Sequence, residues 1–254
     1  MNTLVLKIGG NELDDPAFVD QLARAVATLR PAPVLVHGGG KEIGAIQQAL
    51  GGEPRFVAGL RVTDETALRA AEMVLCGSVA TRLVAALAAA GVDAQGLSGV
   101  DRGLIRVEKQ RHPEGDLGRV GRPVSVRAEV LQSLLAQGVV PVVAPISLGP
   151  DGVYNVNADE AAGAIAAAIA AAQVVFVTNV PGVRVGERGG EGASIAPRLS
   201  RAQVEELIGD GTISGGMIPK VRAALSALDA GVRAARITNL AGLSSAESGT
   251  VITA

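Results

Sequence analysis

The sequence has few of the side chains that several common protein chemistries require. Its 254 residues include no Trp, a single Cys, two His and only 2% aromatic residues. One cysteine, Cys76, cannot form an internal disulfide or a multi-cysteine zinc site, which favours a reducing, cytoplasmic setting. So few aromatic side chains argue against stacking on single-stranded nucleic acid. A formal net charge of −2 argues against a duplex-binding basic surface.

Membrane and metal signals are equally weak. The longest apolar run, residues 161–177, is mostly alanine and turns β-branched after Gln173. This change predicts a buried helix followed by a strand, because a membrane span needs ~20 strongly apolar residues. The N-terminus lacks a basic region before an apolar stretch, so we expect no signal peptide and no membrane partner. Without H-E-x-x-H or a spaced His/Cys set, we expect no metal site built from side chains.

Glycine, by contrast, is abundant at 33 residues, and it recurs where apolar strands end. Residues 4–8 and 33–36 have the pattern of short buried strands, and a glycine turn follows each of them. A helical pattern comes after each turn, over residues 16–29 and 41–50. Strand, glycine turn and helix in succession predict a parallel sheet that binds ligands at the carboxyl ends of its strands.

The rest of the chain continues this pattern with one excursion. Asp64 begins a long helical stretch that Gly77 is expected to divide. Short β-prone pieces among Gly, Pro and charged residues predict a hairpin outside the parallel core over residues 101–126. A single apolar strand is expected over residues 139–146. The turn at residues 150–152 predicts a boundary between two lobes.

The expected fold class is therefore α/β, a three-layer α/β/α sandwich with a central, mostly parallel sheet and two lobes, residues 1–149 and 150–254.

Three glycine turns are candidates for anion binding, because backbone N–H groups at a helix start attract phosphate or carboxylate. They are Gly9 with Gly10, then Gly38, Gly39 and Gly40, and finally Gly215 with Gly216. Tight-turn chemistry alone explains each of them equally well. The chain contains no P-loop, and residues 38–44 miss G-x-G-x-x-G by one position. Residues 96–100 break the G-x-S-x-G pattern of serine hydrolases at the last glycine.

Polar residues next to these turns are candidates for phosphoryl-transfer chemistry. Lys7 and Lys220 each lie beside a glycine turn, where two cations could stabilise the charge of a transferring phosphoryl group. Asp159 could orient ammonium groups, or it could simply cap a helix. Arg61 could bind a carboxylate through two parallel hydrogen bonds. Asn155 precedes the same alanine-rich helix as Asp159.

Taken in order, these segments resemble the amino-acid kinase family. The ordered set comprises residues 7–10, 37–40, 59–64, 154–159 and 215–220. It spans nearly the whole chain and is far more specific than any one piece. Within the family, it is most similar to the branch that phosphorylates N-acetyl-L-glutamate in arginine biosynthesis.

The resemblance implies ATP-dependent transfer of phosphate to the γ-carboxylate of N-acetyl-L-glutamate. Lys7 and Lys220 would stabilise the transition state, and Asp159 would orient them. The first lobe would bind the acyl amino acid and dimerise, and the second would bind ATP, with Mg²⁺ held mainly through the phosphates. The implied binding residues are Gly39, Gly40, Arg61 and Asn155 for the substrate, and Asn179, Val180, Pro181, Gly182, Val183, Arg184, Thr212, Ile213 and Ser214 for the nucleotide. A carboxylate is already nucleophilic at neutral pH, so the shortage of histidine fits this chemistry.

Some features depart from the family pattern. The family commonly has Asp at the position of Asn179, and residues 238–250 lack its usual Asp-Gly-Arg stretch. Arginine-inhibited hexameric members carry a helix ahead of the first strand, whereas three residues precede Leu4 here. We therefore expect a homodimer without arginine feedback.

Two other functions remain open at this stage. One is the related kinase that phosphorylates aminoadipate or glutamate on a carrier protein, and the other is a catalytically silent regulatory binder. Turnover with different acceptors distinguishes all three.

Overall fold

The structure is a computed structural model that describes residues 3–186, 194–245 and 247–254. Its main element is an eight-stranded sheet with the order β14-β16-β15-β11-β1-β2-β8-β5, in which only the β15–β16 pair is antiparallel. The strands of this sheet are β1 (Leu4–Ile8), β2 (Val34–His37), β5 (Ala94–Ser98), β8 (Val140–Ala144), β11 (Gln173–Thr178), β14 (Arg198–Ser200), β15 (Ala235–Asn239) and β16 (Thr250–Thr253). The predicted mostly parallel sheet is confirmed.

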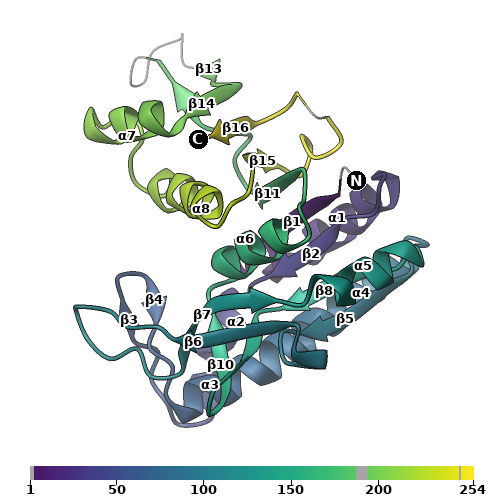
Figure 1. The fold of residues 1–254 in the computed structure, drawn as a ribbon, viewed down its shortest axis with the longest axis vertical. Helices are drawn as coiled ribbons and strands as arrows, with labels where there is room; N and C mark the ends of the chain where they lie inside the picture. The colour runs from purple at the N-terminus through teal and green to yellow at the C-terminus, as the bar shows by residue number, and fades with distance from the viewer. Residues whose placement is uncertain (1–2, 187–193, 246) are drawn as a thin grey trace.

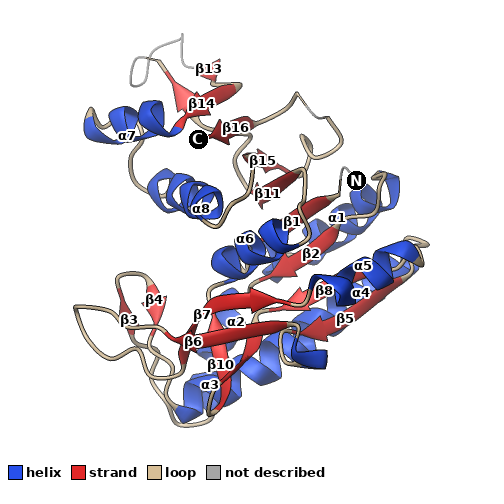
Figure 2. Cartoon of the chain, in the orientation of Figure 1, coloured by secondary structure: helices blue, strands red, loops and turns tan. Residues whose placement is uncertain are grey.

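Helices cover both faces of this sheet (Figures 1 and 2). Side chains alternate across each strand, so Val5 and Phe176 face one hydrophobic core while Leu6 and Ile8 face the other. The first core is closed by α5 (Ala128–Ala136), α6 (Ala158–Ala168), α7 (Arg201–Gly209) and α8 (Met217–Asp229). The second is closed by α1 (Pro16–Thr28), α2 (Gly40–Ala49), α3 (Glu65–Glu72) and α4 (Ala80–Ala89). The three-layer prediction is therefore confirmed.

A small closed sheet, β10-β7-β6-β9, lies beside the main one. It is formed by β6 (Ile105–Lys109), β7 (Val120–Val126), β9 (Ile146–Gly149) and β10 (Gly152–Val156). The antiparallel pair β6–β7 is the predicted hairpin outside the parallel core.

The single strand expected over residues 139–146 was wrong, because the chain passes from one sheet to the other at Pro145. Proline has no N–H for a strand ladder, and only its carbonyl is used, accepting from Val156 N at 2.9 Å. The predicted turn at residues 150–152 joins β9 to β10 inside the small sheet. The division into two lobes at this turn stays a prediction.

The long helical stretch begins at Asp64 as predicted, with the Asp64 carboxylate accepting from Ala67 N at 2.8 Å. Gly77 does not divide it, because a π-helix (Met73–Val79) joins α3 to α4 with wider hydrogen-bonded turns. Among the described residues, Glu65–Ala89 is the one helix long and apolar enough to cross a membrane by length and composition. Its inner face, including Leu75 and Leu83, packs in the second core, as expected of a core helix.

The described part of the chain has a few shorter elements. They are the hairpin β3 (Phe56–Val57) with β4 (Leu60–Arg61), the pair β12 (Arg184–Val185) with β13 (Ser194–Ile195), and the 3₁₀ turns Glu12–Asp14 and Asp101–Gly103. The β3–β4 hairpin projects from the main sheet on the side of α2 and α3 (Figure 1).

Candidate active site

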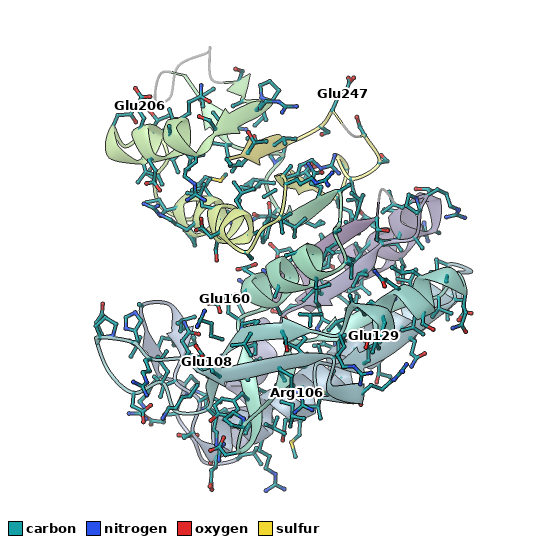
Figure 3. All side chains as sticks on the ribbon, viewed as in Figure 1. Arg106, Glu108, Glu129, Glu160, Glu206 and Glu247 are labelled. Atoms are coloured by element: carbon teal, nitrogen blue, oxygen red, sulfur yellow. The ribbon has the colours of Figure 1, made fainter. Side chains whose placement is uncertain are left out.

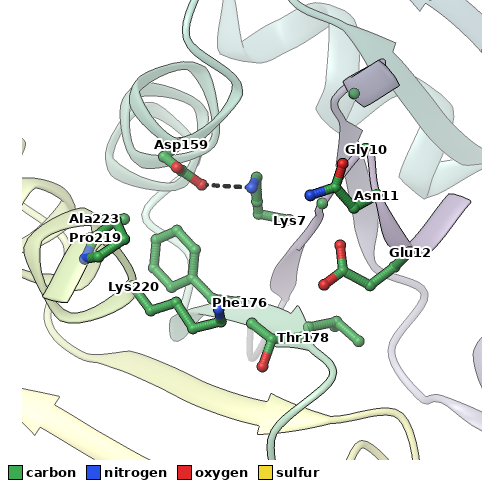
Figure 4. A pocket seen from close by; sticks show the side chains of 13 residues that line it. Lys7, Gly10, Asn11, Glu12, Asp159, Phe176, Thr178, Pro219, Lys220 and Ala223 are labelled. Atoms are coloured by element: carbon green, nitrogen blue, oxygen red, sulfur yellow. Dashed lines mark ion pairs between the residues drawn. The ribbon is translucent and has the colours of Figure 1, made fainter. Parts of the chain in front are cut away.

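A cavity of about 290 Å³ opens where the carboxyl ends of β1 and β11 meet the starts of α6 and α8 (Figure 4). Six of the residues that line it were site candidates from the sequence: Lys7, Gly9, Gly10, Gly40, Asp159 and Lys220. The others, which sequence reasoning missed, are Asn11, Glu12, Phe176, Val177, Thr178, Pro219 and Ala223. The fold thus brings all three predicted catalytic residues together from distant parts of the chain.

Lys7 and Asp159 form an ion pair at the centre of this cavity. Lys7 Nζ lies 2.8 Å from Asp159 Oδ1, and both side chains are mostly buried. Asp159 is not the helix cap, because Asn157 takes that position and accepts from Asp159 N at 2.7 Å. The carboxylate of Asp159 is therefore free to hold the Lys7 ammonium in place.

Lys220 lies in the first turn of α8 and lines the same cavity from that helix (Figure 4). Its Nζ donates to Gly216 O at 3.3 Å, within its own helix. Among the described residues, the ion pair of Asp159 is with Lys7. A role for Asp159 in orienting Lys220 stays a prediction.

Two of the glycine turns pack directly against each other. A Cβ on Gly10 would collide with the backbone N of Gly40, and one on Gly40 would lie 2.8 Å from Gly10 C. Gly40 also has a φ of +47°, which L side chains rarely adopt. A Cβ on Gly39 would lie 2.8 Å from Ile43 Cδ1. Only glycine lets the backbones ending β1 and β2 come this close beside the cavity.

The third turn is less crowded. A Cβ on Gly215 or Gly216 would meet nothing within 4 Å, although Gly215 has a φ of +55°. Gly38 extends the sheet, donating from its N to Ile8 O at 3.1 Å. Glycine is therefore required at Gly10 and Gly40 because a Cβ would collide with the other turn, whereas at Gly215 it is favoured by the positive φ alone.

His37 lies at the end of β2, directly before the second glycine turn, and it is fully buried. Burial lowers its pKa from 6.5 to about 4, although contact with the Gly38 carbonyl opposes the shift. The ring is neutral near pH 7 and does not line the cavity. Its place is structural, beneath the glycine turn.

Glu160, next to Asp159, is also outside the cavity. It extends from the start of α6 near β7 (Figure 3). Burial raises its pKa, and the neighbouring Asp159 carboxylate adds to the shift.

A second polar network surrounds Arg61. Its Nη1 donates to Gln47 Oε1 at 2.9 Å, and its guanidinium lies 4.8 Å from the centre of the Phe56 ring. Thr63 Oγ1 donates to Arg61 O at 2.9 Å and accepts from Asn155 Nδ2 at 3.2 Å. Two of the four predicted substrate residues, Arg61 and Asn155, are therefore linked through Thr63, although neither lines the 290 Å³ cavity.

The Arg61 guanidinium is partly buried, and burial lowers its pKa. Within the described ranges, no carboxylate lies within ion-pair distance of it. A half-buried cation without a counter-ion is a suitable site for an anionic ligand.

Sequence reasoning missed Gln47, although the signal was present. It lies four residues after Ile43 on the buried face of α2, where an apolar side chain is the usual choice.

The predicted nucleotide residues occupy two loops, one after β11 and one before α8. Asn179, Arg184 and Ser214 are exposed. Val183 and Ile213 are buried in the first core, so their side chains serve packing. The Val183 N–H is also taken, donating to Thr250 Oγ1 at 2.8 Å. Nucleotide binding by these loops stays a prediction.

Among the described residues, no group of three or more His, Cys, Asp or Glu side chains could hold a metal ion. The cavity instead combines two lysines, two carboxylates and glycine turns. This arrangement can stabilise negative charge on a transferring phosphoryl group without a histidine base.

Known proteins are similar to this chain over nearly its whole length. An acetylglutamate kinase of Roseiflexus castenholzii is 71% identical over 99% of this chain and 94% of its own. One of Chloroflexus aurantiacus is 52% identical over 94% and 92%. Among solved structures, smu.665 from Streptococcus mutans UA159 has a TM-score of 0.77 at 27% identity, over 99% of this chain and 98% of that chain. The profile described as "Amino acid kinase family" matches residues 2–239. The chain belongs to the amino acid kinase family.

Proposed function

We propose that this chain phosphorylates the γ-carboxylate of N-acetyl-L-glutamate with ATP, giving the acyl phosphate used in arginine biosynthesis. The observation that carries the proposal is the convergence of Lys7, Asp159 and Lys220 on one cavity beside two packed glycine turns. The relatives at 71% and 52% identity are both named acetylglutamate kinase, which supports this acceptor.

The chemistry needs positioning and charge stabilisation. A γ-carboxylate oxygen of the acceptor forms a bond to the γ-phosphorus while the bond to the β,γ-bridging oxygen breaks, and ADP leaves with that electron pair. Negative charge on the phosphoryl oxygens is stabilised by the ammonium groups of Lys7 and Lys220. Asp159 fixes Lys7 through the 2.8 Å ion pair, so little reorganisation is needed during transfer.

The acceptor is held at its other end. We assign its α-carboxylate to the Arg61 guanidinium, which is positioned by Gln47 and Phe56 and has no protein counter-ion in the described part of the chain. Asn155, whose Nδ2 donates to Thr63, is assigned to the acetylated nitrogen, with its Oδ1 accepting from that N–H.

The residues present fit a nucleotide accompanied by Mg²⁺. Gly9, Gly10 and Gly40 line the cavity, so their backbone is available to phosphate oxygens, and two lysines face the same space. Mg²⁺ binds mainly to oxygen ligands that include substrate phosphates, and it neutralises their charge when bound. The loops holding Asn179 to Arg184 and Thr212 to Ser214 are assigned to the remainder of the nucleotide.

We further assign a cytoplasmic homodimer. β5 is an edge strand of the main sheet, and grooves on both of its sides share Gly96, Leu97 and Asp101. Met73, on the adjoining helix, is 46% exposed. An edge strand between two grooves offers a surface that a second copy can cover symmetrically. Light scattering should give twice the chain mass of 25.5 kDa, and a monomer at micromolar concentration would contradict this assignment.

The function is tested by ADP release from ATP and Mg²⁺ with a panel of acceptors. These are N-acetylglutamate, free glutamate, N-acetylaminoadipate and a carrier-protein conjugate. Turnover with N-acetylglutamate and weak turnover with the others is expected. Preference for the conjugate would identify the carrier-linked kinase, and binding without turnover would identify a silent binder. Either result rejects the proposal.

A further inference from the structure

Glu12 is the second carboxylate of the cavity. It lines the same space as Lys7, Asp159 and Lys220. In Figure 4 the carboxylates of Glu12 and Asp159 lie on either side of Lys7. The carboxylate of Glu12 is thus directed into the space that the two lysines face, where the proposed function requires the phosphates of the nucleotide.

The backbone around Glu12 is held by its surroundings. It begins the 3₁₀ turn Glu12–Asp14, in which Leu13 is buried. Asp15 N donates to Glu12 O at 3.3 Å, and Arg82 Nη2 donates to Leu13 O at 3.5 Å. The carboxylate lies over Gly9, where a Cβ would collide with Glu12 Oε2 and lie 3.0 Å from Glu12 Cδ. The glycine at position 9 makes room for this carboxylate.

Glu12 differs from Asp159 in having no partner. Asp159 is neutralised by Lys7, whereas the carboxylate of Glu12 makes neither an ion pair nor a hydrogen bond with any residue that the structure describes. An unpaired carboxylate beside the polyphosphate of ATP would repel it. A divalent cation between the two removes that repulsion.

We propose that Glu12 is the protein's own carboxylate ligand for the Mg²⁺ that accompanies the nucleotide, an inference that rests on the proposed kinase function. Mg²⁺ in nucleotide sites is held by one or two carboxylates together with substrate phosphates and water. The described residues contain no group of three or more His, Cys, Asp or Glu side chains that could hold a metal ion by themselves. Among the carboxylates that line the cavity, Glu12 is the one without an ion-pair partner in the described part of the chain, so it is the carboxylate available to the metal.

Metal binding is measured directly, without turnover. Mn²⁺ replaces Mg²⁺ as a paramagnetic probe, and its affinity for the protein–ADP complex is followed by electron paramagnetic resonance. ADP affinity is measured in parallel with EDTA present. The variants are Glu12→Gln, which removes the charge, and Glu12→Asp, which keeps it. Asp14→Asn is the matched control, because Asp14 shares the 3₁₀ turn but does not line the cavity. Thermal unfolding establishes that each variant is folded.

Glu12→Gln should weaken Mn²⁺ binding at least about tenfold, as expected when a metal ligand is lost, and Glu12→Asp should weaken it less. Metal-free ADP affinity should stay the same or rise, and Asp14→Asn should match the wild type. Unchanged Mn²⁺ affinity in Glu12→Gln overturns the inference. If metal-free ADP then binds more tightly, Glu12 merely repels phosphate.

The same measurements separate this inference from the proposed function. If the wild-type protein binds ADP and Mn²⁺ but does not phosphorylate N-acetylglutamate, the proposed acceptor is wrong. The role of Glu12 is still supported in that case, provided that Glu12→Gln weakens metal binding. Wild-type protein that binds neither ADP nor Mn²⁺ contradicts both.

Discussion

Replacing Gln47 with Leu removes the hydrogen bond that orients Arg61, together with the one that Gln47 Nε2 donates to Glu53 O at 3.1 Å, while keeping a buried aliphatic side chain. Gln47 is 1% exposed and accepts from Arg61 Nη1 at 2.9 Å. A hydrogen bond to a charged group contributes roughly 1.5–3 kcal/mol, and 1.4 kcal/mol corresponds to about tenfold in affinity. Because Arg61 lies outside the cavity that holds the lysines, the loss should appear in substrate binding rather than in phosphoryl transfer.

The assay is steady-state kinetics with N-acetylglutamate varied at saturating ATP. KM for N-acetylglutamate should rise roughly 10- to 100-fold in Gln47→Leu, with kcat nearly unchanged. Gln47→Glu should raise KM further, since it gives Arg61 a carboxylate that competes with the substrate. Gln48→Leu, at the exposed neighbouring position, is the control and should behave as the wild type. A kcat loss with unchanged KM would refute the assignment of Arg61 to the substrate carboxylate.

Three further outcomes follow from the geometry. Lys220→Ala should lower kcat on the order of a hundredfold with little change in KM, and unchanged kcat would make Lys220 a bystander. Gly10→Ala should abolish turnover because its Cβ would collide with Gly40, and a fully active variant would show that the two turns need not pack. His37 should make unfolding pH-dependent. Its pKa in the folded protein is about 4, below the usual 6.5, so the unfolded chain binds a proton first as the pH falls. The contribution of His37 to the free energy of unfolding is therefore complete above pH 6.5 and decreases by roughly 3 kcal/mol between pH 6.5 and pH 4. Denaturant unfolding of His37→Gln should lack that part of the slope, and identical slopes would rule out the histidine as its source.

Much of the site could be predicted because parallel strands place their carboxyl ends on one edge of the sheet. Lys7 in β1 and the start of α6 were each identifiable from local pattern, and the packing of α6 against β1 brings Asp159 to Lys7. The glycine turns were recognisable for the same reason. What remained ambiguous was whether Asp159 caps its helix, and the structure gives that role to Asn157.

The remaining features depend on tertiary contacts that local sequence does not encode. A continuous apolar run does not show that its two halves belong to different sheets, so the passage of the chain from the main sheet to the small sheet at Pro145 was missed. The π-helix at Met73–Val79 keeps the helix continuous through Gly77 by packing against the second core. From the sequence alone Glu12 has the pattern of a surface residue, and only the 3₁₀ turn places its carboxylate over Gly9. Each of these features depends on which distant segments of the chain pack against it in the folded protein.

Detection of the acyl phosphate tests the central claim most directly. Hydroxylamine attacks the acyl carbon of such a product and displaces phosphate, leaving a stable hydroxamate. Wild-type protein incubated with ATP, Mg²⁺ and N-acetyl-L-glutamate should form hydroxamate in equal amount to ADP, and Lys220→Ala should form it far more slowly. ADP released without hydroxamate, or no ADP at all, would contradict phosphorylation of the γ-carboxylate by this cavity.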